Sequence, residues 1–320
     1  MSHSEARSLN IKHFSQEKAD DYDKRMEILN QSLVLSKILL SVGTSYIDEL
    51  PKIDLSDVDL TVRIDRSLFL RGISDGGIFR SKEGLKILDF ACGTGLVTYD
   101  IASHLLPNSK IVGIDISQPV LNNFNDRFKF CNSFENFFYK NGIEVVSYRY
   151  DILDNTFNVR NSLEEPKELN QAKFDIVYCT ISYHHLEDID QITARLSGYL
   201  LPNGTLIILD FYNSDIELQN HHDHHINNNE AVRQLHGISR KKLLDTFGKA
   251  GLVDIRVEPV AKLKMYRALK FIKNHCSKEN VEKLEKNELK MFQILELDGT
   301  RTKTYLVENE LVMAIGKKGN

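Results

Sequence analysis

From residue 85 onward, short apolar runs alternate with amphipathic segments along the chain. The apolar runs predict buried strands at 85–90, 111–115, 145–150, 174–179 and 205–210. The segments between them carry apolar residues at helical spacing and predict helices at 96–106, 117–142 and 189–201. This alternation is typical of an α/β fold.

Strands that alternate with helices form a parallel sheet covered on both faces. Right-handed crossovers bring the carboxyl end of every strand to one edge, and ligands bind on that edge where the strand order reverses. The first candidates for a site are therefore the residues that close or follow each strand. These are 89–95, 115–117, 151–152, 180–185 and 210–212.

The flanks of this region are helical in pattern. Residues 15–42 predict one helix with Ser15 as its N-cap, since the apolar residues recur near helical spacing. Ser239 is expected to cap a helix over 241–250. Residues 264–295 predict one or two charged helices.

The turn after the first strand, "DFACGTG", is of a type that holds nucleotides. A dinucleotide fingerprint needs a third small residue, but Thr98 stands where that residue would follow Gly93 and Gly95. Asp89 is poorly placed for a pyrophosphate and suits a ligand with positive charge, such as S-adenosylmethionine. Asp115 could accept hydrogen bonds from the ribose of either ligand. We therefore favour S-adenosylmethionine and keep an NAD-type dinucleotide-binding oxidoreductase as an alternative.

Five motifs in order carry a resemblance to a known family. "ILDFACGTG", "VGIDIS", "RYDILD", "FDIVYCTISYHHLED" and "LLPNGTLIILDFY" resemble class I S-adenosylmethionine-dependent methyltransferases of the small-molecule type that includes the ubiquinone-biosynthesis enzymes. The resemblance covers about 85–212. It implies a Rossmann-like, seven-stranded, mostly parallel sheet with helices on both faces and an antiparallel last strand. The remaining two strands then fall at 253–260 and 310–317.

The resemblance also implies a cofactor site. The matching positions are Tyr22, Asp89, Ala91, Cys92, Gly93, Thr94, Gly95, Asp115, Ile116, Asp151, Ile152 and Thr180. In the family pattern Asp89 and the glycine turn hold the methionine part, and Asp115 binds the ribose hydroxyls. Asp151 would accept from the adenine amino group, and Ile116 and Ile152 would lie beside the adenine.

Residues past the fourth and fifth strands are candidates for the acceptor site. His184 and His185 are the candidate catalytic residues, because a histidine can take a proton near neutral pH. Neighbours on an extended segment point opposite ways, so we expect one of them to face the pocket and the other to be structural. Tyr183, Tyr212 and His236 are candidate substrate contacts.

Neither the histidines nor the cysteines show a metal pattern. "HHDHH" at 221–225 lacks a paired cysteine or an H-E-x-x-H motif and is expected to be a loop, so no metal is predicted. None of the four cysteines lies in a C-x-x-C pair, which indicates reduced thiols.

We expect one methyltransferase domain over 1–320 with additions to a family core. The core would comprise 85–262 and 309–318, and 263–308 would be a helical insertion before the last strand. Residues 1–84 would be a helical lid, because "HFSQEKADDYD" resembles the segment that folds over the cofactor in this family. A further polar insertion lies at 155–172.

Composition and charge limit the binding partners that we expect. The formal net charge of −4 gives no general attraction to nucleic acid, and no apolar run reaches membrane-spanning length. We therefore expect a cytoplasmic enzyme, with the nucleus as a second location, that methylates a small molecule. A methyltransferase acting on a protein or tRNA is the alternative, but its "NPPY"-like signature is absent, since the fourth strand is followed by "TISY". A scaffold protein with a degenerate cofactor site is less favoured still.

Overall fold

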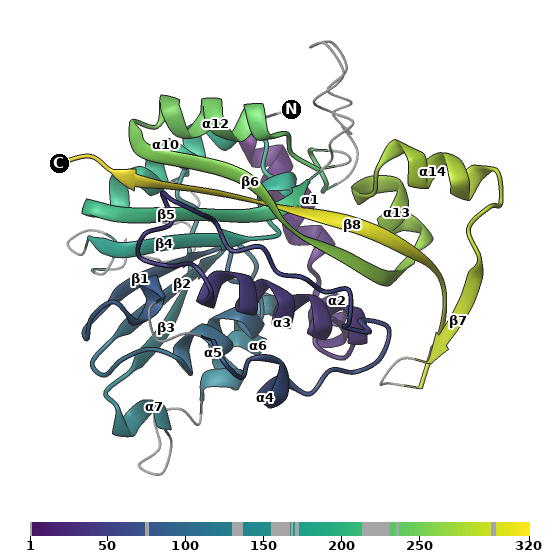
Figure 1. Cartoon of the computed structure of the whole chain (residues 1–320), viewed down its shortest axis with the longest axis horizontal. Coiled ribbons are helices and arrows are strands. Elements are labelled where there is room, and N and C mark those ends of the chain that lie inside the picture. The colour runs from purple at the N-terminus through teal and green to yellow at the C-terminus, as the bar shows by residue number, and fades with distance from the viewer. Residues whose placement is uncertain are drawn as a thin grey trace.

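The computed structural model describes residues 2–73, 77–129, 137–154, 167, 169, 173–212, 231–234, 237–295 and 299–320. Within these residues one eight-stranded sheet has the order β3-β2-β1-β4-β5-β8-β6, and β7 pairs with β8 (Figure 1). The strands are β1 (Lys86–Phe90), β2 (Lys110–Asp115), β3 (Glu144–Arg149), β4 (Phe174–Thr180), β5 (Leu200–Tyr212), β6 (Leu252–Ala268), β7 (Met291–Leu295) and β8 (Arg301–Lys318).

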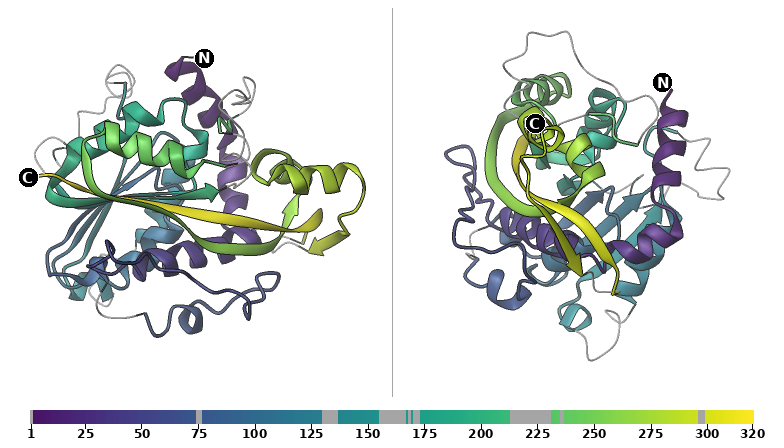
Figure 2. Two further views of the ribbon diagram at one scale, coloured as in Figure 1. Left: turned by 45° about the horizontal axis from the view of Figure 1, so that its top comes forward. Right: turned by 90° about the vertical axis from the view of Figure 1, so that its right-hand side faces the viewer.

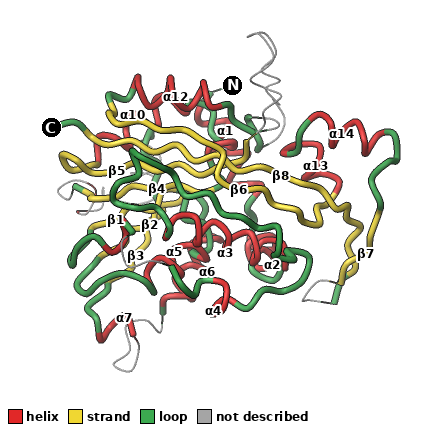
Figure 3. Tube along the Cα trace, viewed as in Figure 1, coloured by secondary structure: helices red, strands yellow, loops and turns green. Residues whose placement is uncertain are grey.

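Helices cover both faces of this sheet (Figure 3). They are α1 (His3–His13), α2 (Gln16–Tyr22), α3 (Met26–Leu40), α4 (Arg66–Phe69), α5 (Leu96–Ala102), α6 (Gln118–Phe128), α7 (Phe137–Lys140), α10 (Ile189–Tyr199), α12 (Arg240–Lys249), α13 (Leu269–His275) and α14 (Lys278–Glu285), with short 3₁₀ helices η1 (Ile78–Arg80) and η2 (Tyr183–His185).

Alternate residues of each strand enter different cores. Ile87 and its equivalents pack with α3, α5 and α6 on one face, whereas Leu88 and its equivalents pack with α10 and α12 on the other. Because both faces are buried, the central strands are continuous apolar runs, and this is the pattern that made them predictable. The predicted α/β class is confirmed.

The strand order places the site. β1 pairs in parallel with both β2 and β4, so the order reverses between β1 and β4. The carboxyl ends of β1, β2 and β4 meet at one edge, where ligands bind in open α/β sheets. α1 and α2 lie at this edge in both further views of the molecule (Figure 2).

The N-terminal segment differs from its prediction. Residues 15–42 form two helices, α2 and α3, because the chain turns between Tyr22 and Met26, and Ser15 makes no side-chain cap. An additional helix, α1, precedes them. Its N-terminus is fixed by a capping box in which Ser2 and Glu5 bond to each other's backbone N–H groups.

Other predicted boundaries also shift. The helix expected at 96–106 ends at Ala102, and the one expected over 117–142 ends at Phe128. The helix expected to run to residue 201 ends at Tyr199, because the chain continues directly into β5. The helix capped by Ser239 is confirmed, since Ser239 Oγ accepts from the Lys242 N–H.

The C-terminal region contains more strand than expected. β6 runs on to Ala268 and pairs antiparallel with β8, which also pairs antiparallel with β5. The segment predicted to be helical over 264–295 therefore begins as strand, and it contains α13, α14 and β7. The family's sheet of seven strands gains an eighth, because β7 forms an antiparallel pair with the start of β8. In Figure 1 this addition extends beyond one end of the sheet.

Two smaller findings bear on the chemistry. Cys92, Cys179 and Cys276 are free thiols, and Cys131 lies outside the described residues. Among the helices that the structure describes, none combines the length and the apolar character that a membrane crossing requires.

Candidate functional site

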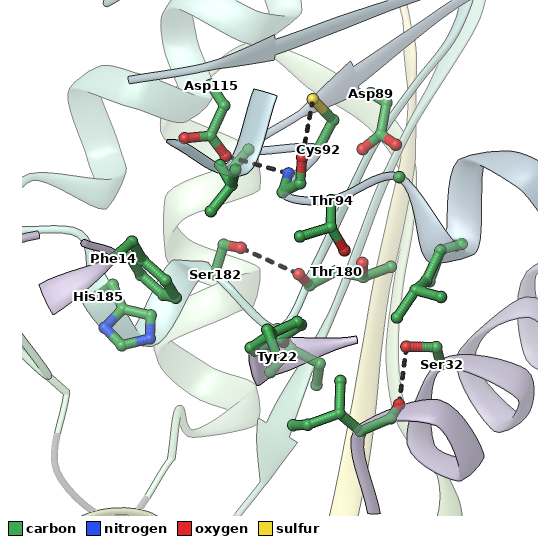
Figure 4. Close-up of a pocket in the computed structure, with 18 of the residues that line it drawn as sticks. Phe14, Tyr22, Ser32, Asp89, Cys92, Thr94, Asp115, Thr180, Ser182 and His185 are labelled. Carbon is green, nitrogen blue, oxygen red and sulfur yellow. Dashed lines mark hydrogen bonds between the residues drawn. The ribbon is translucent and has the colours of Figure 1, made fainter. Parts of the chain in front are cut away.

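A cavity lies at the carboxyl ends of β1, β2 and β4, beneath the N-terminal helices (Figure 4). Most residues of the predicted cofactor site line it. They are Tyr22, Asp89, Ala91, Cys92, Gly93, Thr94, Gly95, Asp115, Ile116 and Thr180. Asn10, Gln31 and Ser32, which the sequence did not single out, line it as well.

The glycine turn has a shape that other residues would not tolerate. Gly95 has a φ of +78°, and a Cβ there would lie 2.7 Å from the Phe124 ring. A Cβ on Gly113 of β2 would lie 2.9 Å from Cys92 Sγ, so a small side chain is needed on both sides of this contact. The turn thereby packs its backbone closely against α6 and β2.

Asp89 is a buried carboxylate held by two hydroxyl groups. Thr98 Oγ1 donates to its Oδ2 at 2.6 Å, and Tyr178 OH donates to the same oxygen at 2.7 Å. Burial raises the pKa of Asp89 to about 7, and the nearby Asp115 adds to the increase. Thr98, which breaks the dinucleotide fingerprint, therefore positions the acid that suits a cationic ligand.

Asp115 is fixed by backbone groups. The Gly93 N–H donates to its Oδ2 at 3.0 Å and the Ser117 N–H donates to its Oδ1 at 2.9 Å. Burial raises the pKa of Asp115 to about 6. A buried acid, Asp89, and a half-buried one, Asp115, at one cavity favour a ligand that offers a cation and hydroxyl donors, because such a ligand replaces the water they have lost.

Side chains dock the N-terminal helices onto this site. Thr94 Oγ1 donates to Asp23 Oδ1 at 2.6 Å, and Arg127 pairs with Asp23 Oδ2 at 2.5 Å. Ser117 Oγ donates to the Phe14 carbonyl at 3.1 Å, and Asn10 Nδ2 donates to the His185 carbonyl at 3.2 Å. The segment 10–23 is thus tied to the glycine turn, to the start of α6 and to η2.

Asp151 and Ile152 lie in an adjoining small cavity that they share with α1. The Asp151 carboxylate is bonded to His3 Nε2 at 2.9 Å and to Arg7 Nη1 at 2.9 Å. Burial alone would raise the pKa of Asp151, but hydrogen bonds from His3 and Arg7 hold it below its usual range. The predicted contact with adenine would require α1 to share or release this carboxylate.

The two candidate catalytic histidines are placed differently. His185 lines the cavity, and its Nδ1 bonds the Ala231 carbonyl at 3.0 Å. Burial, with contributions from His184 and His275, lowers the pKa of His185 well below its usual value. His184 is buried away from the cavity, and its Nδ1 bonds Asp210 Oδ1 at 2.7 Å. The expected division between one pocket-facing and one inner histidine is thus seen.

The reason given for that division was wrong. The segment is a 3₁₀ helix, η2, rather than an extended strand, and the two imidazole rings lie 4.1 Å apart instead of pointing opposite ways. A third ring, that of His275 at the end of α13, lies 4.9 Å from His184. Sequence reasoning missed His275 because a lone histidine in a charged helix carries no signal.

Of the predicted substrate contacts, Tyr183 and Tyr212 do not line the cavity. Tyr183 is fully buried, with its OH 3.0 Å from Thr193 Oγ1, so it cannot reach a ligand. Tyr212 packs against the core on the α10 and α12 face. His236 and the 221–225 segment lie outside the described residues.

Comparison with known proteins agrees with this geometry. Residues 88–206 match the family described as methyltransferase domain. An uncharacterized methyltransferase of Schizosaccharomyces pombe is 34% identical over 205 residues, which is 63% of each chain. The 27-O-demethylrifamycin SV methyltransferase of Amycolatopsis mediterranei is 26% identical over 42% of each chain. The matches span less than two thirds of either relative.

A solved structure with a related sheet is phosphoethanolamine N-methyltransferase 2 of Haemonchus contortus in complex with S-adenosyl-L-methionine. It has 14% identity and a TM-score of 0.41, covering 75% of this chain and 50% of that one. The methyltransferase-domain match confirms the resemblance drawn from the five motifs, and with it the cofactor class, S-adenosylmethionine. The ubiquinone-type subclass stays a prediction.

Proposed function

We propose that this chain, through its methyltransferase domain, transfers the methyl group of S-adenosylmethionine to a small molecule. The observation that carries the proposal is the pair of acids, Asp89 and Asp115, flanking one glycine turn in one cavity. S-adenosylmethionine has an ammonium, a sulfonium and a ribose diol but no phosphate. Cationic groups and hydroxyl donors bind well to two carboxylates, whereas the negatively charged pyrophosphate of a dinucleotide would be repelled by them.

Two acids of the chain would bind different parts of the cofactor. Asp89, oriented by Thr98 and Tyr178, would hold the ammonium end, and Asp115, oriented by Gly93 and Ser117, would accept from the ribose hydroxyls. When bound, the cofactor supplies an electrophilic methyl group, and its sulfur keeps the electron pair of the broken bond. Catalysis by the protein is then mainly positioning of the acceptor.

His185 is the candidate group for an acceptor that must lose a proton. It is the member of the histidine pair that lines the cavity, and its Nδ1 is engaged by a carbonyl. That bond keeps the proton on Nδ1 and leaves the Nε2 lone pair for an acceptor's hydroxyl or thiol. Its lowered pKa keeps the ring neutral near pH 7, as a base must be.

The enclosed site favours a small acceptor over a macromolecule. Asn10, Phe14 and Tyr22 of the N-terminal segment form one wall of the cavity, and side-chain bonds fix this wall to the core. A protein or RNA chain needs an open groove, and in RNA recognition that groove is also basic. The relative from Amycolatopsis, whose name states a rifamycin acceptor, supports the same choice.

The remaining expectations are proposals of the same kind. We propose that segment 1–84 serves as the lid of a single domain and that 263–308 is an insertion into it. We also propose a cytoplasmic location, because three free thiols are expected in a reducing compartment.

The test is incubation of the chain with S-adenosylmethionine labelled in its methyl group and a fractionated cell extract. Label in the small-molecule pool supports the proposal, whereas label in protein or RNA assigns the alternative acceptor class. Calorimetry with S-adenosylhomocysteine and with NAD checks the cofactor independently. Saturable NAD binding without S-adenosylhomocysteine binding would overturn the proposal.

A further inference from the structure

Three histidines from distant parts of the chain converge beside the cavity. One ring nitrogen each of His184, His185 and His275 lies within 4.8 Å of the others. The first two belong to η2, after β4, and the third ends α13, in the region that follows β6. The sequence predicted no metal site, because these residues form no spaced motif.

Each of the three rings is held by a hydrogen bond at the same atom. His184 Nδ1 bonds Asp210 Oδ1 at 2.7 Å, His185 Nδ1 bonds the Ala231 carbonyl at 3.0 Å, and His275 Nδ1 bonds the Phe271 carbonyl at 3.1 Å. All three partners are acceptors, so every Nδ1 carries the proton. When the rings are neutral, each Nε2 therefore presents a lone pair.

This is the arrangement that outer partners impose on metal-ligating histidines, whose second ring nitrogen bonds a carboxylate or a backbone carbonyl. Asp210 is itself fixed, because its Oδ1 accepts from the Phe211 N–H at 2.7 Å and its Oδ2 from the His184 N–H at 3.3 Å. Ring nitrogens grouped this closely favour a cation or a donor between them, because their lone pairs repel one another.

We propose that His184, His185 and His275 bind one divalent transition-metal ion of the zinc class through their Nε2 atoms. Three neutral imidazoles and one open position make up the ligand set of a catalytic zinc site. Zn–N bonds of about 2.0–2.1 Å place tetrahedral ligands roughly 3.3 Å apart, so the ring nitrogens would draw together by up to about 1.5 Å.

The surroundings of the cluster are largely aromatic. The Phe211 ring lies 5.4 Å from His184 and 5.5 Å from His275, and the Phe271 ring stacks on His275 at 4.4 Å. Packing on this side keeps the rings in place.

The open position would face the cavity, because His185 is the ligand that lines it. This part of the inference rests on the proposed function. An acceptor's hydroxyl or thiol would bind the ion there, and His185 would then be a ligand rather than a base. α13 lies outside the matched 88–206 region, so the C-terminal addition would complete the acceptor site.

Cobalt(II) added to the metal-free, tag-free chain tests the inference. We expect one cobalt per chain by elemental analysis, visible absorption bands of a low-coordinate N-ligated ion, and a higher melting temperature with zinc. A wild-type chain that takes up no cobalt or zinc overturns the inference, whatever the variants do.

His275→Asn locates the ion. The Asn amide can keep the bond to the Phe271 carbonyl but lacks the outer nitrogen, so we expect at least a 100-fold loss of cobalt affinity. His104→Asn is the matched control, because His104 Nδ1 bonds the carbonyl of Asp100 four residues before it, as His275 does with Phe271, yet His104 lies outside the cluster. It should bind cobalt as the wild type does.

A third variant replaces the histidines at 221, 222, 224 and 225 by Ser. Cobalt uptake that is lost in this variant but kept in His275→Asn would overturn the inference. Calorimetry with S-adenosylhomocysteine separates the two proposals. If the wild-type chain binds S-adenosylhomocysteine but takes up no metal, the metal site alone is refuted. If the wild-type chain does not bind S-adenosylhomocysteine, the proposed function is refuted.

Discussion

The two ends of the cavity are built in different ways. At the cofactor end, Asp89 and the glycine turn are contiguous in sequence, and Asp115 ends the neighbouring strand. At the proposed acceptor end, η2 and the N-terminal helices contribute residues that lie far apart in the chain, His185 from the former and Asn10 and Phe14 from the latter. A site formed by one strand end and one turn can be read from a motif, whereas a site formed by packing cannot.

The largest effect is expected at the acceptor end. His185→Ala should lower turnover about 10²–10⁴-fold, because it removes the histidine that lines the cavity. Affinity for S-adenosylhomocysteine should stay within about twofold of the wild type, since the cofactor acids are untouched. Turnover is measured as methyl label that enters the small-molecule fraction. An equal fall in turnover and in cofactor affinity would show that the two ends are not separate.

His184→Ala is the companion variant. It removes the buried hydrogen-bond partner of Asp210. The free energy of unfolding, measured by urea denaturation, should therefore fall by about 1–3 kcal/mol. His104→Ala should change neither turnover nor cofactor affinity.

The second prediction addresses the cofactor end. Asp115→Ala removes an acceptor that Gly93 and Ser117 orient, and it should weaken S-adenosylhomocysteine binding by about 1.5–3 kcal/mol, or roughly 10- to 100-fold. Asp126→Ala, on the exposed side of α6, should leave the affinity unchanged. Calorimetry measures both. Unchanged S-adenosylhomocysteine affinity in Asp115→Ala would show that Asp115 does not bind the cofactor.

Local sequence determined how much of the fold could be predicted. The central strands were found because burial on both faces makes them apolar throughout, as Ile87 and Leu88 show by entering opposite cores. Helix ends were less predictable, since the turn between Tyr22 and Met26 carries no glycine or proline. β7 could not be found, because its pairing with β8 is a tertiary contact.

The same holds for the site. Asp89, Asp115 and the glycine turn were predicted because each follows or ends a strand. His275 was missed, and Tyr183 was misplaced, because η2 turns its ring into the core beside Thr193. Only packing decides which side chains after a strand reach the cavity.

The third prediction concerns pH at the cofactor end. A cationic ligand binds ionised acids, and the pKa values are about 7 for Asp89 and about 6 for Asp115. S-adenosylhomocysteine affinity should therefore fall as pH drops below 7, by up to about tenfold per pH unit for each acid that must ionise. Asp89→Asn should flatten the upper part of this profile. A wild-type profile that is flat from pH 5.5 to 8 would contradict the assignment.

The stability of the ligand-free fold should depend on pH in the opposite direction to ligand affinity. Folding raises both pKa values, so these acids favour the fold while protonated, and that stability is lost as pH rises through about 6 and 7. The melting temperature of the ligand-free chain should carry this downward contribution between about pH 4 and 7. S-adenosylhomocysteine should raise the melting temperature most at the upper end of that range.

The smallest effect is expected where the N-terminal segment meets the glycine turn. Asp23→Ala breaks the bonds to Thr94 and Arg127 that hold the N-terminal segment on the glycine turn. Each contact is partly exposed, so we expect only about a two- to tenfold rise in the KM for S-adenosylmethionine, with kcat nearly unchanged. Asp21→Ala, which removes an exposed pair with Lys24, is the control and should have no effect. A fall in kcat as large as that of His185→Ala would mean that the lid also positions the acceptor, and the division between the two ends would fail at this residue.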